Sequence, residues 1–411
     1  MAWQGVFGVE EIALQFARAN ARGRLGGSFL FVGPQGIGKR VFAFQLAKTL
    51  LCRRQFAESG SPILREGETV ESLTSEELLA RFQPCGECDA CKQFEFNVAA
   101  TDVVMPTHPD FTYVCKPAER SFIPIELLIG EREARMQSGF CAELRRTPFL
   151  GGRRVAILDD ADYLNEEGAN ALLKTLEEPP KNTVIILVGT SATKQLPTIR
   201  SRCQIFRFSP LTSDNVADVL LTQEAVGSPE EAEAIARNSG GSMTEAYRSL
   251  NSDFSQFQHT LLTELSRTPF NAVQLAAKVC EYVDAASKEA SIRRPRLQHI
   301  LLSALVYFRT MYRELAADGA RFGSEPGFAT AHPFVRRALN SREFSPEYVL
   351  ACEERTLEAL EQVDKNANLP FVAEAWLYDL AEYRRRDRRP LFCCPHPAGR
   401  RPRPRRRPQT Y

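Results

Sequence analysis

The chain has 411 residues, of which 44% are hydrophobic and 25% are charged. This composition is typical of globular proteins and excludes a collagen-like or fully disordered chain, and the length allows two or three domains. No apolar run approaches the ~18 residues that a membrane-spanning helix needs, and the N-terminus lacks the basic and apolar stretches of a secretory signal. We therefore expect a cytoplasmic protein without a membrane partner, whose eleven cysteines stay reduced.

The charge is distributed unevenly along the chain. The net charge is +1, but residues 384–411 contain eleven arginines and one acidic residue, which leaves 41 basic and 50 acidic residues elsewhere, a net charge of −9. We expect a mildly acidic folded body followed by a basic, disordered tail rich in Arg and Pro. The tail could bind DNA phosphates, or it could be a solvated extension without function.

A short apolar run over residues 29–32 is followed by a glycine-rich loop and a predicted helix over residues 37–51. The loop, residues 33–39, matches G-x-x-x-x-G-K. In this motif the glycines let backbone N–H groups surround phosphate oxygens, the lysine reaches the β and γ phosphates, and the helix adds its positive N-terminal end. We therefore predict a phosphate-binding loop with the candidate residues Gly33, Gly36, Gly38 and Lys39.

The residue after the lysine departs from this motif. A Ser or Thr is expected there because its hydroxyl ligates Mg²⁺. The chain has Arg40, which is positively charged and cannot ligate a cation. We therefore expect that ATP could still bind at a degenerate site while Mg²⁺-dependent hydrolysis is impaired. The alternative is an inherited loop shape that no longer holds ATP.

Residues 53–84 are polar and rich in turn formers and look like an insertion. Cys85, Cys88 and Cys91 follow at two-residue spacing. This is a metal-ligand spacing, and a set of thiolates suits a closed, structural zinc site. An iron–sulfur cluster and simple free thiols are the alternatives. A fourth ligand is needed, and Cys115 is one candidate.

A buried strand is predicted over residues 155–158, after a predicted helix over residues 126–144. The strand ends in Asp159 and Asp160. An acid at such a strand end can hold the metal, and the next acid can activate the attacking water. Asp159 suits the first role. Asp160 is one methylene shorter than the Glu usual in the second role and would be a poorer base. A solvated acidic loop is the alternative.

The remaining elements complete the predicted fold. Asn165 is expected to cap a helix that ends before Pro179, and residues 184–188 form another buried strand. The alternation of strands and helices predicts an α/β fold with a mainly parallel sheet. After Pro210 the pattern is helical. The predicted helical segments are a small unit over 212–250, then 271–284, 295–316, 347–363 and 369–383.

Two motifs carry a resemblance to a known family. Residues 170–180 (Asn-Ala-Leu-Leu-Lys-Thr-Leu-Glu-Glu-Pro-Pro) and 199–203 (Ile-Arg-Ser-Arg-Cys) resemble signatures of the AAA+ subunits of bacterial DNA polymerase III clamp loaders, and residues 108–110 (His-Pro-Asp) agree. The resemblance covers about residues 3–250 and is weaker beyond. It implies an AAA+ P-loop base domain over 1–208 with an insertion and zinc module at 53–115, a helical lid over 209–250, and an all-α oligomerisation collar over 251–383.

The resemblance also implies roles for individual residues. In this family the arginine of the Ser-Arg-Cys motif enters the ATP site of a neighbouring subunit, and Arg202 matches it. A planar, permanently charged guanidinium suits the charge that develops on the γ phosphate. The family has a phosphate-sensing polar residue where Thr190 or Ser191 ends the strand. Its fourth zinc ligand matches Cys52, which would complete a site with Cys85, Cys88 and Cys91.

Three departures from the family pattern bear on ATP hydrolysis. The family contains hydrolysing motor subunits of the gamma/tau type and a non-hydrolysing delta-prime type. Motor subunits carry a γ-phosphate-sensing arginine where this chain has Thr244, and Arg40 and Asp160 are the other two departures. Together they favour the delta-prime type, a stator that presents Arg202 in trans without hydrolysing ATP itself. A working motor and a DNA-binding accessory protein that acts through the tail are the alternatives.

The resemblance implies partners as well. We expect a hetero-oligomer with the gamma/tau motor subunits and the delta subunit of a DNA-directed DNA polymerase holoenzyme. Contact with the sliding clamp and primed DNA would be made through the assembled complex.

Overall fold

The structure is a computed structural model that describes residues 2–56, 64, 68–97, 104–117, 120, 122–135, 137–150, 152–250, 252–267, 269–285, 290–318, 334–335 and 344–387. The chain divides into two compact units, Met1–Ser255 and Gln256–Tyr411, which are considered separately. Most of the predicted basic tail, from residue 388 onward, lies outside the described residues. Within the described part of the chain, no helix is both long enough and apolar enough to cross a membrane.

A five-stranded parallel sheet forms the centre of the first unit, with strand order β4-β5-β6-β3-β7. The strands are β3 (Gly27–Val32), β4 (Phe111–Val114), β5 (Arg154–Leu158), β6 (Thr183–Gly189) and β7 (Gln204–Arg207). The predicted parallel α/β sheet is confirmed. A short antiparallel hairpin, β1 (Ala2–Trp3) and β2 (Val6–Phe7), precedes it. Strands β4 and β7 were not predicted, because four residues are too few to show a period.

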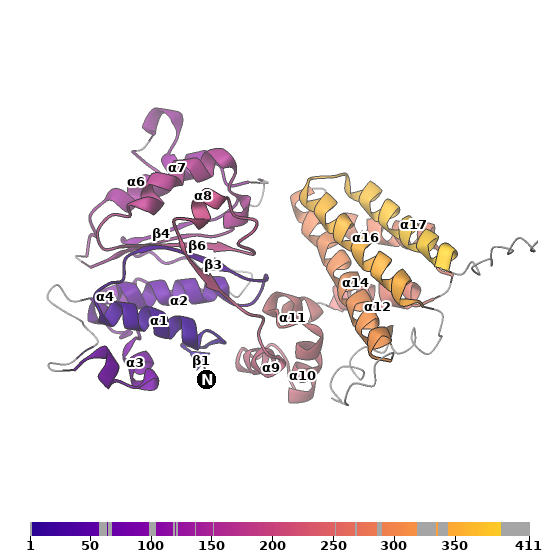
Figure 1. Ribbon diagram of the computed structural model, residues 1–411, viewed down its shortest axis with the longest axis horizontal. Helices are drawn as coiled ribbons and strands as arrows, with labels where there is room; N and C mark the ends of the chain where they lie inside the picture. Colours follow the sequence, from indigo (N-terminus) through magenta and orange to yellow (C-terminus); the bar gives the residue numbers. More distant parts are fainter. Residues whose placement is uncertain are drawn as a thin grey trace, which may run out of the picture. The chain divides into compact units, whose positions relative to one another are not determined.

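Helices cover both faces of the sheet (Figure 1). On one face, α1 (Glu10–Ala21) and α2 (Lys39–Leu51) pack on phenylalanine-rich strands, and the rings of Phe16 and Phe206 stack with centroids 4.9 Å apart. On the other face lie α5 (Ile125–Ile129), α6 (Phe140–Arg145), α7 (Glu166–Glu177) and α8 (Pro197–Arg200). Alternate strand residues face opposite ways, so each strand contributes to both cores. The sheet edge that carries the loops is thereby held rigidly.

The predicted single helix over residues 126–144 is wrong. The structure has α5, a 3₁₀ turn η3 (Arg132–Ala134), and α6. Gly130 and Gly139 separate them, with φ of 83° and 84°, values that favour glycine. A Cβ on Gly139 would lie 2.6 Å from the backbone nitrogen of Gly130. The two glycines therefore bring the chain back on itself where apolar periodicity alone suggested one continuous helix.

The insertion after α2 contains more structure than its composition predicted. It includes η1 (Arg53–Gln55), η2 (Val70–Ser72) and α3 (Ser75–Arg81), and α4 (Asp89–Lys92) follows. Thr74 and Glu77 form a reciprocal capping box at the start of α3. The indole of Trp3 donates to the carbonyl oxygen of Phe82 at 3.3 Å. The insertion is thus anchored to the N-terminal hairpin.

A buried carboxylate connects β4 to β5. Asp110 is 1% exposed and accepts hydrogen bonds from the backbone N–H groups of Phe149 (2.6 Å) and Leu150 (2.9 Å). It also accepts one from the guanidinium of Arg154 at 3.1 Å. All three donors lie in or next to the start of β5, so Asp110 fixes the loop that leads into the strand ending at Asp159.

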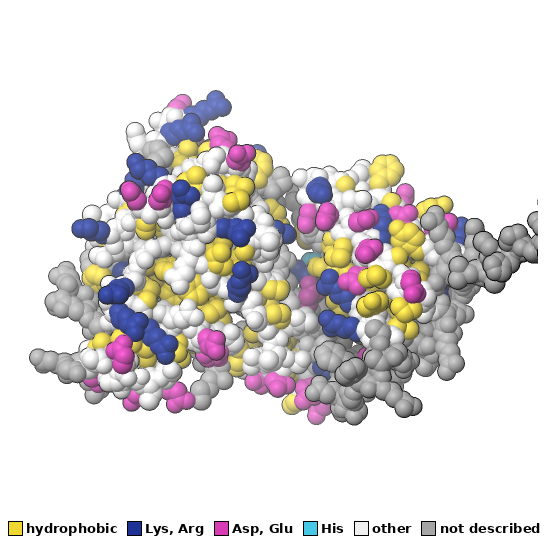
Figure 2. All heavy atoms as spheres, in the orientation of Figure 1, with side chains coloured by type: hydrophobic (Ala, Val, Ile, Leu, Met, Phe, Trp, Pro, Cys, Tyr) yellow, Lys and Arg dark blue, Asp and Glu magenta, His cyan; other side chains and the backbone are white. Residues whose placement is uncertain are grey.

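Three short helices close the first unit: α9 (Ser213–Thr222), α10 (Pro229–Asn238) and α11 (Met243–Ser249). They have a small core of their own, centred on Val216, Leu220 and Ala246. A 3₁₀ turn, η4 (Ala161–Tyr163), follows β5. On the face of this unit shown in Figure 2, basic and acidic side chains are interspersed. That face does not carry the single-sign charge expected of a DNA-wrapping surface.

The second unit is helical, as the sequence predicted. Its helices are α13 (Ala272–Asp284), α14 (Ala290–Asp318), α16 (Pro346–Asp364), α17 (Leu369–Asp387) and most of α12 (Ser252–Leu265), whose first residues belong to the first unit. Trp376, Tyr307 and Phe308 are among the largest buried side chains, and the indole of Trp376 donates to the hydroxyl of Thr356 at 3.0 Å. α14 packs against α16, and α13 packs against α17.

Candidate nucleotide site and cysteine cluster

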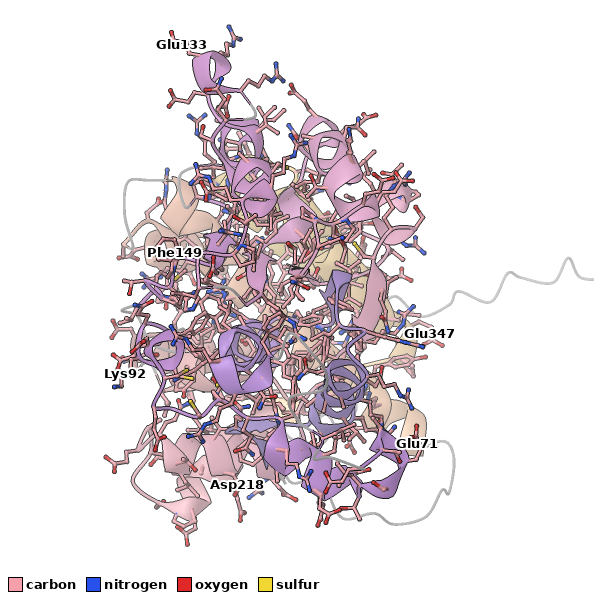
Figure 3. The ribbon with its side chains drawn as sticks, turned by 90° about the vertical axis from the view of Figure 1, so that its left-hand side faces the viewer. Glu71, Lys92, Glu133, Phe149, Asp218 and Glu347 are labelled. Atoms are coloured by element: carbon pink, nitrogen blue, oxygen red, sulfur yellow. The ribbon has the colours of Figure 1, made fainter. Side chains whose placement is uncertain are left out.

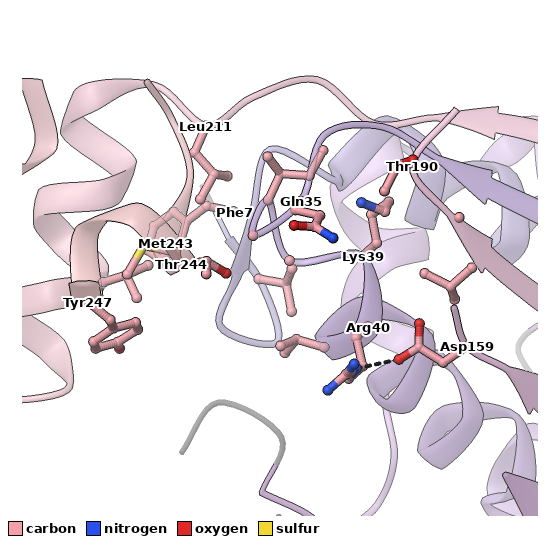
Figure 4. A pocket seen from close by; sticks show the side chains of 18 of the residues that line it. Phe7, Gln35, Lys39, Arg40, Asp159, Thr190, Leu211, Met243, Thr244 and Tyr247 are labelled. Atoms are coloured by element: carbon pink, nitrogen blue, oxygen red, sulfur yellow. Dashed lines mark hydrogen bonds and ion pairs between the residues drawn. The ribbon is translucent and has the colours of Figure 1, made fainter. Parts of the chain in front are cut away.

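A cavity of about 340 Å³ lies at the carboxyl edge of the sheet in the first unit. Its walls come from the β1–β2 hairpin, the glycine loop, the ends of β5 and β6, and helices α9 and α11 (Figure 4). The predicted site residues that line it are Gly36, Gly38, Lys39, Arg40, Asp159, Asp160 and Thr190. Residues 35–40 and 159–160 are thus brought together, as expected at the carboxyl edge of a parallel sheet.

The glycine loop has the conformation that its sequence predicted. Gly36 and Gly38 have φ of 77° and 89°. Gly38 precedes α2 without any side-chain cap, so the first N–H groups of that helix remain available to an anion. Gly33 does not line the cavity. A Cβ there would lie 2.5 Å from the carbonyl oxygen of Phe208, which explains the requirement for glycine by close backbone approach.

Lys39 is 7% exposed and points back into the loop. Its ammonium donates to the carbonyl oxygens of Gly33 (2.7 Å) and Pro34 (2.5 Å). Burial lowers the pKa of Lys39 to about 8, although the carboxylates of Asp159 and Asp162 act in the opposite direction. The two carbonyl oxygens therefore hold a largely buried ammonium at the phosphate loop.

The guanidinium of Arg40 is ion-paired and hydrogen-bonded to the buried carboxylate of Asp159, as Figure 4 shows. The hydroxyl of Tyr113 donates to the same carboxylate oxygen at 3.1 Å, and the backbone N–H of Asp160 donates to the other oxygen at 2.9 Å. Both oxygens of Asp159 are thus engaged by donors of this chain. The residues present do not fit a Mg²⁺ ion at this position.

Asp160 lies beside this pair with φ of 55°, in the left-handed region. Burial and the adjacent charge of Asp159 raise the pKa of Asp160. Burial also opposes the charge of Arg40, but Asp159 outweighs it and raises the pKa of that guanidinium. The charges of Arg40 and Asp159 therefore stabilise each other. Asp160 has a shorter side chain than Glu and lies in the left-handed backbone region.

Asp162 is a site residue that the sequence analysis missed. Its carboxylate accepts hydrogen bonds from the backbone N–H (2.7 Å) and hydroxyl (2.5 Å) of Thr190 and from the side-chain amide of Gln195 (2.5 Å). Thr190 lines the cavity, and its hydroxyl donates to Asp162. The sequence did contain a signal for this residue, because Asp162 is a third acidic residue two positions after the pair Asp159 and Asp160.

Arg202 lies just after α8 and is not among the residues that line the cavity. Its Nε donates to the Glu177 carboxylate at 3.2 Å, and its Nη1 donates to the carbonyl oxygen of Thr198 at 3.1 Å. The side chain is 29% exposed. The two family motifs, in α7 and after α8, are thus joined by an ion pair on the surface of the first unit.

The sulfur atoms of Cys52, Cys85, Cys88 and Cys91 all lie within 4.8 Å of one another. Cys52 ends α2, and Cys88 and Cys91 belong to the start and body of α4. Figure 3 shows sulfur atoms close to the labelled Lys92 of α4. Tetrahedral zinc with Zn–S bonds of ~2.3 Å places its sulfurs about 3.8 Å apart. The Cys85 and Cys91 sulfurs are 3.9 Å apart, so the four residues fit such an ion.

Backbone groups orient two of these thiols. The N–H of Cys85 points to the sulfur of Cys52, and the N–H of Cys88 points to the sulfur of Cys85, both at 3.3 Å. Burial raises the pKa of Cys52 and of Cys91. At Cys85 burial acts the same way, but N–H donors from Cys88 and Glu87 outweigh it and lower the pKa to about 6. The rival ligand Cys115 lies elsewhere, beside Tyr113.

Known proteins are similar to about half of this chain. The family model described as "DNA polymerase III, delta subunit" matches residues 68–212. The delta-prime subunit of Pseudomonas aeruginosa DNA polymerase III is 34% identical over 222 residues, which is 54% of this chain and 55% of that protein. The Bacillus subtilis delta-prime subunit is 28% identical over 233 residues, 57% of this chain and 56% of that protein.

More distant matches include the Escherichia coli DNA polymerase III subunit tau, 26% identical over 247 residues, 59% of this chain and 31% of that protein. Among solved structures, a DNA polymerase III gamma subunit-related protein of Thermotoga maritima is 16% identical with a TM-score of 0.37, covering 91% of this chain and 99% of that chain.

The chain spans about half the length of the delta-prime subunits that it matches. The family model spans residues 68–212, a range that contains Cys85, Cys88, Cys91, the acidic pair Asp159 and Asp160, and Arg202. Over about half of its length the chain is similar to DNA polymerase III delta-prime subunits, and residues 68–212 match the DNA polymerase III delta subunit family model.

Proposed function

We propose that this chain is a stator of a DNA polymerase III clamp loader, which helps to load the sliding clamp on primed DNA without hydrolysing ATP itself. The observation that carries the proposal is the ion pair between Arg40 and Asp159. Arg40 replaces the Ser or Thr that would ligate a catalytic Mg²⁺, and it also pairs with Asp159, the carboxylate that such an ion would need. A site without its metal lacks the charge that activates the γ phosphate.

The α11 end of the cavity supports the same proposal. Thr244 lines the cavity at the position where motor subunits of the family have a phosphate-sensing arginine. Arg248, one turn further along α11, is not among the lining residues and is ion-paired with Glu245. No arginine of this helix therefore substitutes for the missing sensor.

Arg202 is proposed to act in trans, on the ATP of a neighbouring motor subunit. Its ion pair with Glu177 is partly exposed, at 29% and 59% of the two side chains, and exposed pairs contribute little stability. Release of Arg202 to a neighbour's phosphate would therefore cost little. A guanidinium placed on a γ phosphate stabilises the transition state of phosphoryl transfer.

The rest of the chain is proposed to follow the family's organisation. Residues 1–208 would form the base, 209–250 the lid and 251–383 an oligomerising collar. A zinc ion held by Cys52, Cys85, Cys88 and Cys91 would cross-link the insertion to the end of α2. The proposed partners are the gamma/tau motor subunits and the delta subunit, with the clamp and primed DNA contacted through the complex.

Steady-state ATP hydrolysis tests the proposal. The full chain is assayed alone and then with its motor subunits, delta subunit, clamp and primed DNA. We expect no turnover by the chain alone, and turnover by the complex that falls about tenfold or more with Arg202→Ala. Arg200→Ala is the matched control, because Arg200 is an exposed arginine two residues away.

Two outcomes would contradict the proposal. Turnover by the chain alone that Lys39→Ala abolishes would identify a motor subunit of the gamma/tau type. Equal turnover by complexes containing Arg202→Ala and the wild-type chain would exclude Arg202 as the residue that acts in trans.

A further inference from the structure

The cavity in the first unit retains the features that hold a phosphate chain. Gly36, Gly38 and Lys39 line it at the uncapped N-terminus of α2, and the Lys39 ammonium is held beside it by the carbonyl oxygens of Gly33 and Pro34. The walls formed by α9, α11 and the segment before α9 are partly apolar, with Val219, Met243 and Leu211. A cavity of about 340 Å³ with one cationic end and one apolar end suits a nucleoside polyphosphate.

A divalent cation does not fit this cavity. Mg²⁺ requires nearly octahedral oxygen ligands and is reluctant to lose its waters. Its expected protein ligand, Asp159, is 4% exposed and already accepts hydrogen bonds from Arg40, Tyr113 and the backbone of Asp160. A cation would have to displace a charge-assisted bond and would be repelled by the guanidinium.

Arg40 can take over part of the cation's role. Only its Nε bonds to Asp159, and no other described residue accepts a hydrogen bond from the guanidinium. The Arg40 side chain is 40% exposed and lines the cavity. A guanidinium presents its donors as a rigid fork, so the Nη groups can bond phosphate oxygens while Nε keeps Asp159. The charged groups around the phosphate position are Lys39, Arg40, Asp159, Asp160 and Asp162.

We propose that the cavity binds a nucleoside polyphosphate without a divalent cation, with the guanidinium of Arg40 bridging Asp159 and the phosphate chain in the cation's place. This inference rests on the proposed function of a stator that does not hydrolyse ATP. A nucleotide bound without a divalent cation would be held in the cavity but would not be hydrolysed. The bound nucleotide would act as a structural ligand that links the phosphate loop to α11. It would remain in place during the motor subunits' cycles.

Titration calorimetry of the full chain with ATP tests this inference. One series contains EDTA and the other contains excess MgCl₂. For the wild-type chain we expect that Mg²⁺ does not increase the affinity for ATP. The affinity in MgCl₂ should be within about twofold of the affinity in EDTA, or lower than it. Mg²⁺ normally strengthens ATP binding at phosphate loops, so the sign of this effect is diagnostic.

Substitutions test whether Arg40 causes this effect of Mg²⁺ on ATP affinity. Arg40→Ser removes the guanidinium and restores a hydroxyl, so ATP binding in EDTA should weaken by about tenfold, and Mg²⁺ should now strengthen it. Arg237→Ser is the control, because Arg237 is an exposed, ion-paired arginine of the same unit that does not line the cavity. Lys39→Ala should abolish binding in both series.

Each other result overturns the inference. Wild-type binding that rises about tenfold with Mg²⁺, or that persists in Lys39→Ala, would do so. An absence of ATP binding by the wild-type chain would also do so, but it would leave the stator proposal intact, since a stator needs no nucleotide of its own. ATP turnover by the chain alone would instead refute the proposed function.

Discussion

The backbone N–H of Met243 donates a hydrogen bond to the carbonyl oxygen of Gly36 at 2.8 Å. The hydroxyl of Ser242 reinforces this contact by donating to the carbonyl oxygen of Gln35 at 3.0 Å. The start of α11 therefore rests directly on the glycine loop, more than 200 residues away in sequence.

Gly36→Ala should destabilise the first unit by about 2 kcal/mol or more. Gly36 has φ of 77°, and an added Cβ would lie 2.2 Å from the Ser242 hydroxyl and 2.6 Å from that of Thr244. Urea unfolding followed by the fluorescence of Trp3, in a Trp376→Phe background, measures the change. Gly227→Ala is the control, because a Cβ there would meet nothing within 4 Å, and similar values for both variants would contradict the contact.

Asp110→Ala should lower the free energy of unfolding by roughly 3–5 kcal/mol, because it removes the buried carboxylate partner of the Arg154 guanidinium and leaves two backbone N–H groups without their acceptor. The same fluorescence assay applies. Glu233→Ala breaks the exposed pair with Arg237 and should change the value by less than about 1 kcal/mol. A small effect of Asp110→Ala would mean that solvent reaches this site readily.

Cys88→Ser should remove about one equivalent of zinc per chain, since four thiolates bind one ion. Elemental analysis of the purified chain measures zinc and iron together, which separates a zinc site from an iron–sulfur cluster. Cys115→Ser should keep the full zinc content, because Cys115 lies beside Tyr113, away from the other four sulfurs. Equal zinc in Cys88→Ser and wild type would refute the site.

ATP affinity should fall as the pH rises above about 8. The pKa of Lys39 is lowered to about 8 by burial, against the opposing effect of Asp159 and Asp162, while Arg40 adds to the lowering. A phosphate chain binds the ammonium form, so binding is complete below that pKa and is lost above it, by up to about tenfold per pH unit. Calorimetry in EDTA between about pH 7 and pH 9.5 measures this dependence. Lys39→Arg stays charged and should give a flat profile, and a flat wild-type profile would contradict the assignment.

Features that depend on local sequence were predictable. The glycine loop, its lysine and the helix after it are contiguous, so spacing alone identified them. The ends of β5 and β6 were found because fully buried strands read as continuous apolar runs. Asn165 was correctly identified as a cap, and it accepts a hydrogen bond from the backbone N–H of Gly168 at 2.8 Å. The spacing of Cys85, Cys88 and Cys91 likewise indicated a metal site.

Contacts between distant residues were decided only by the tertiary structure. Arg40 was recognised as a departure from the motif, but its pairing with Asp159, 119 residues away, depends on the parallel order of the sheet, which brings the start of α2 beside the end of β5. The commitment of the Thr190 hydroxyl to Asp162 has the same origin. Short strands such as β4 form because they pair with neighbouring strands. The turns at Gly130 and Gly139 depend on close backbone contacts. Neither kind of feature leaves a periodic pattern in the sequence.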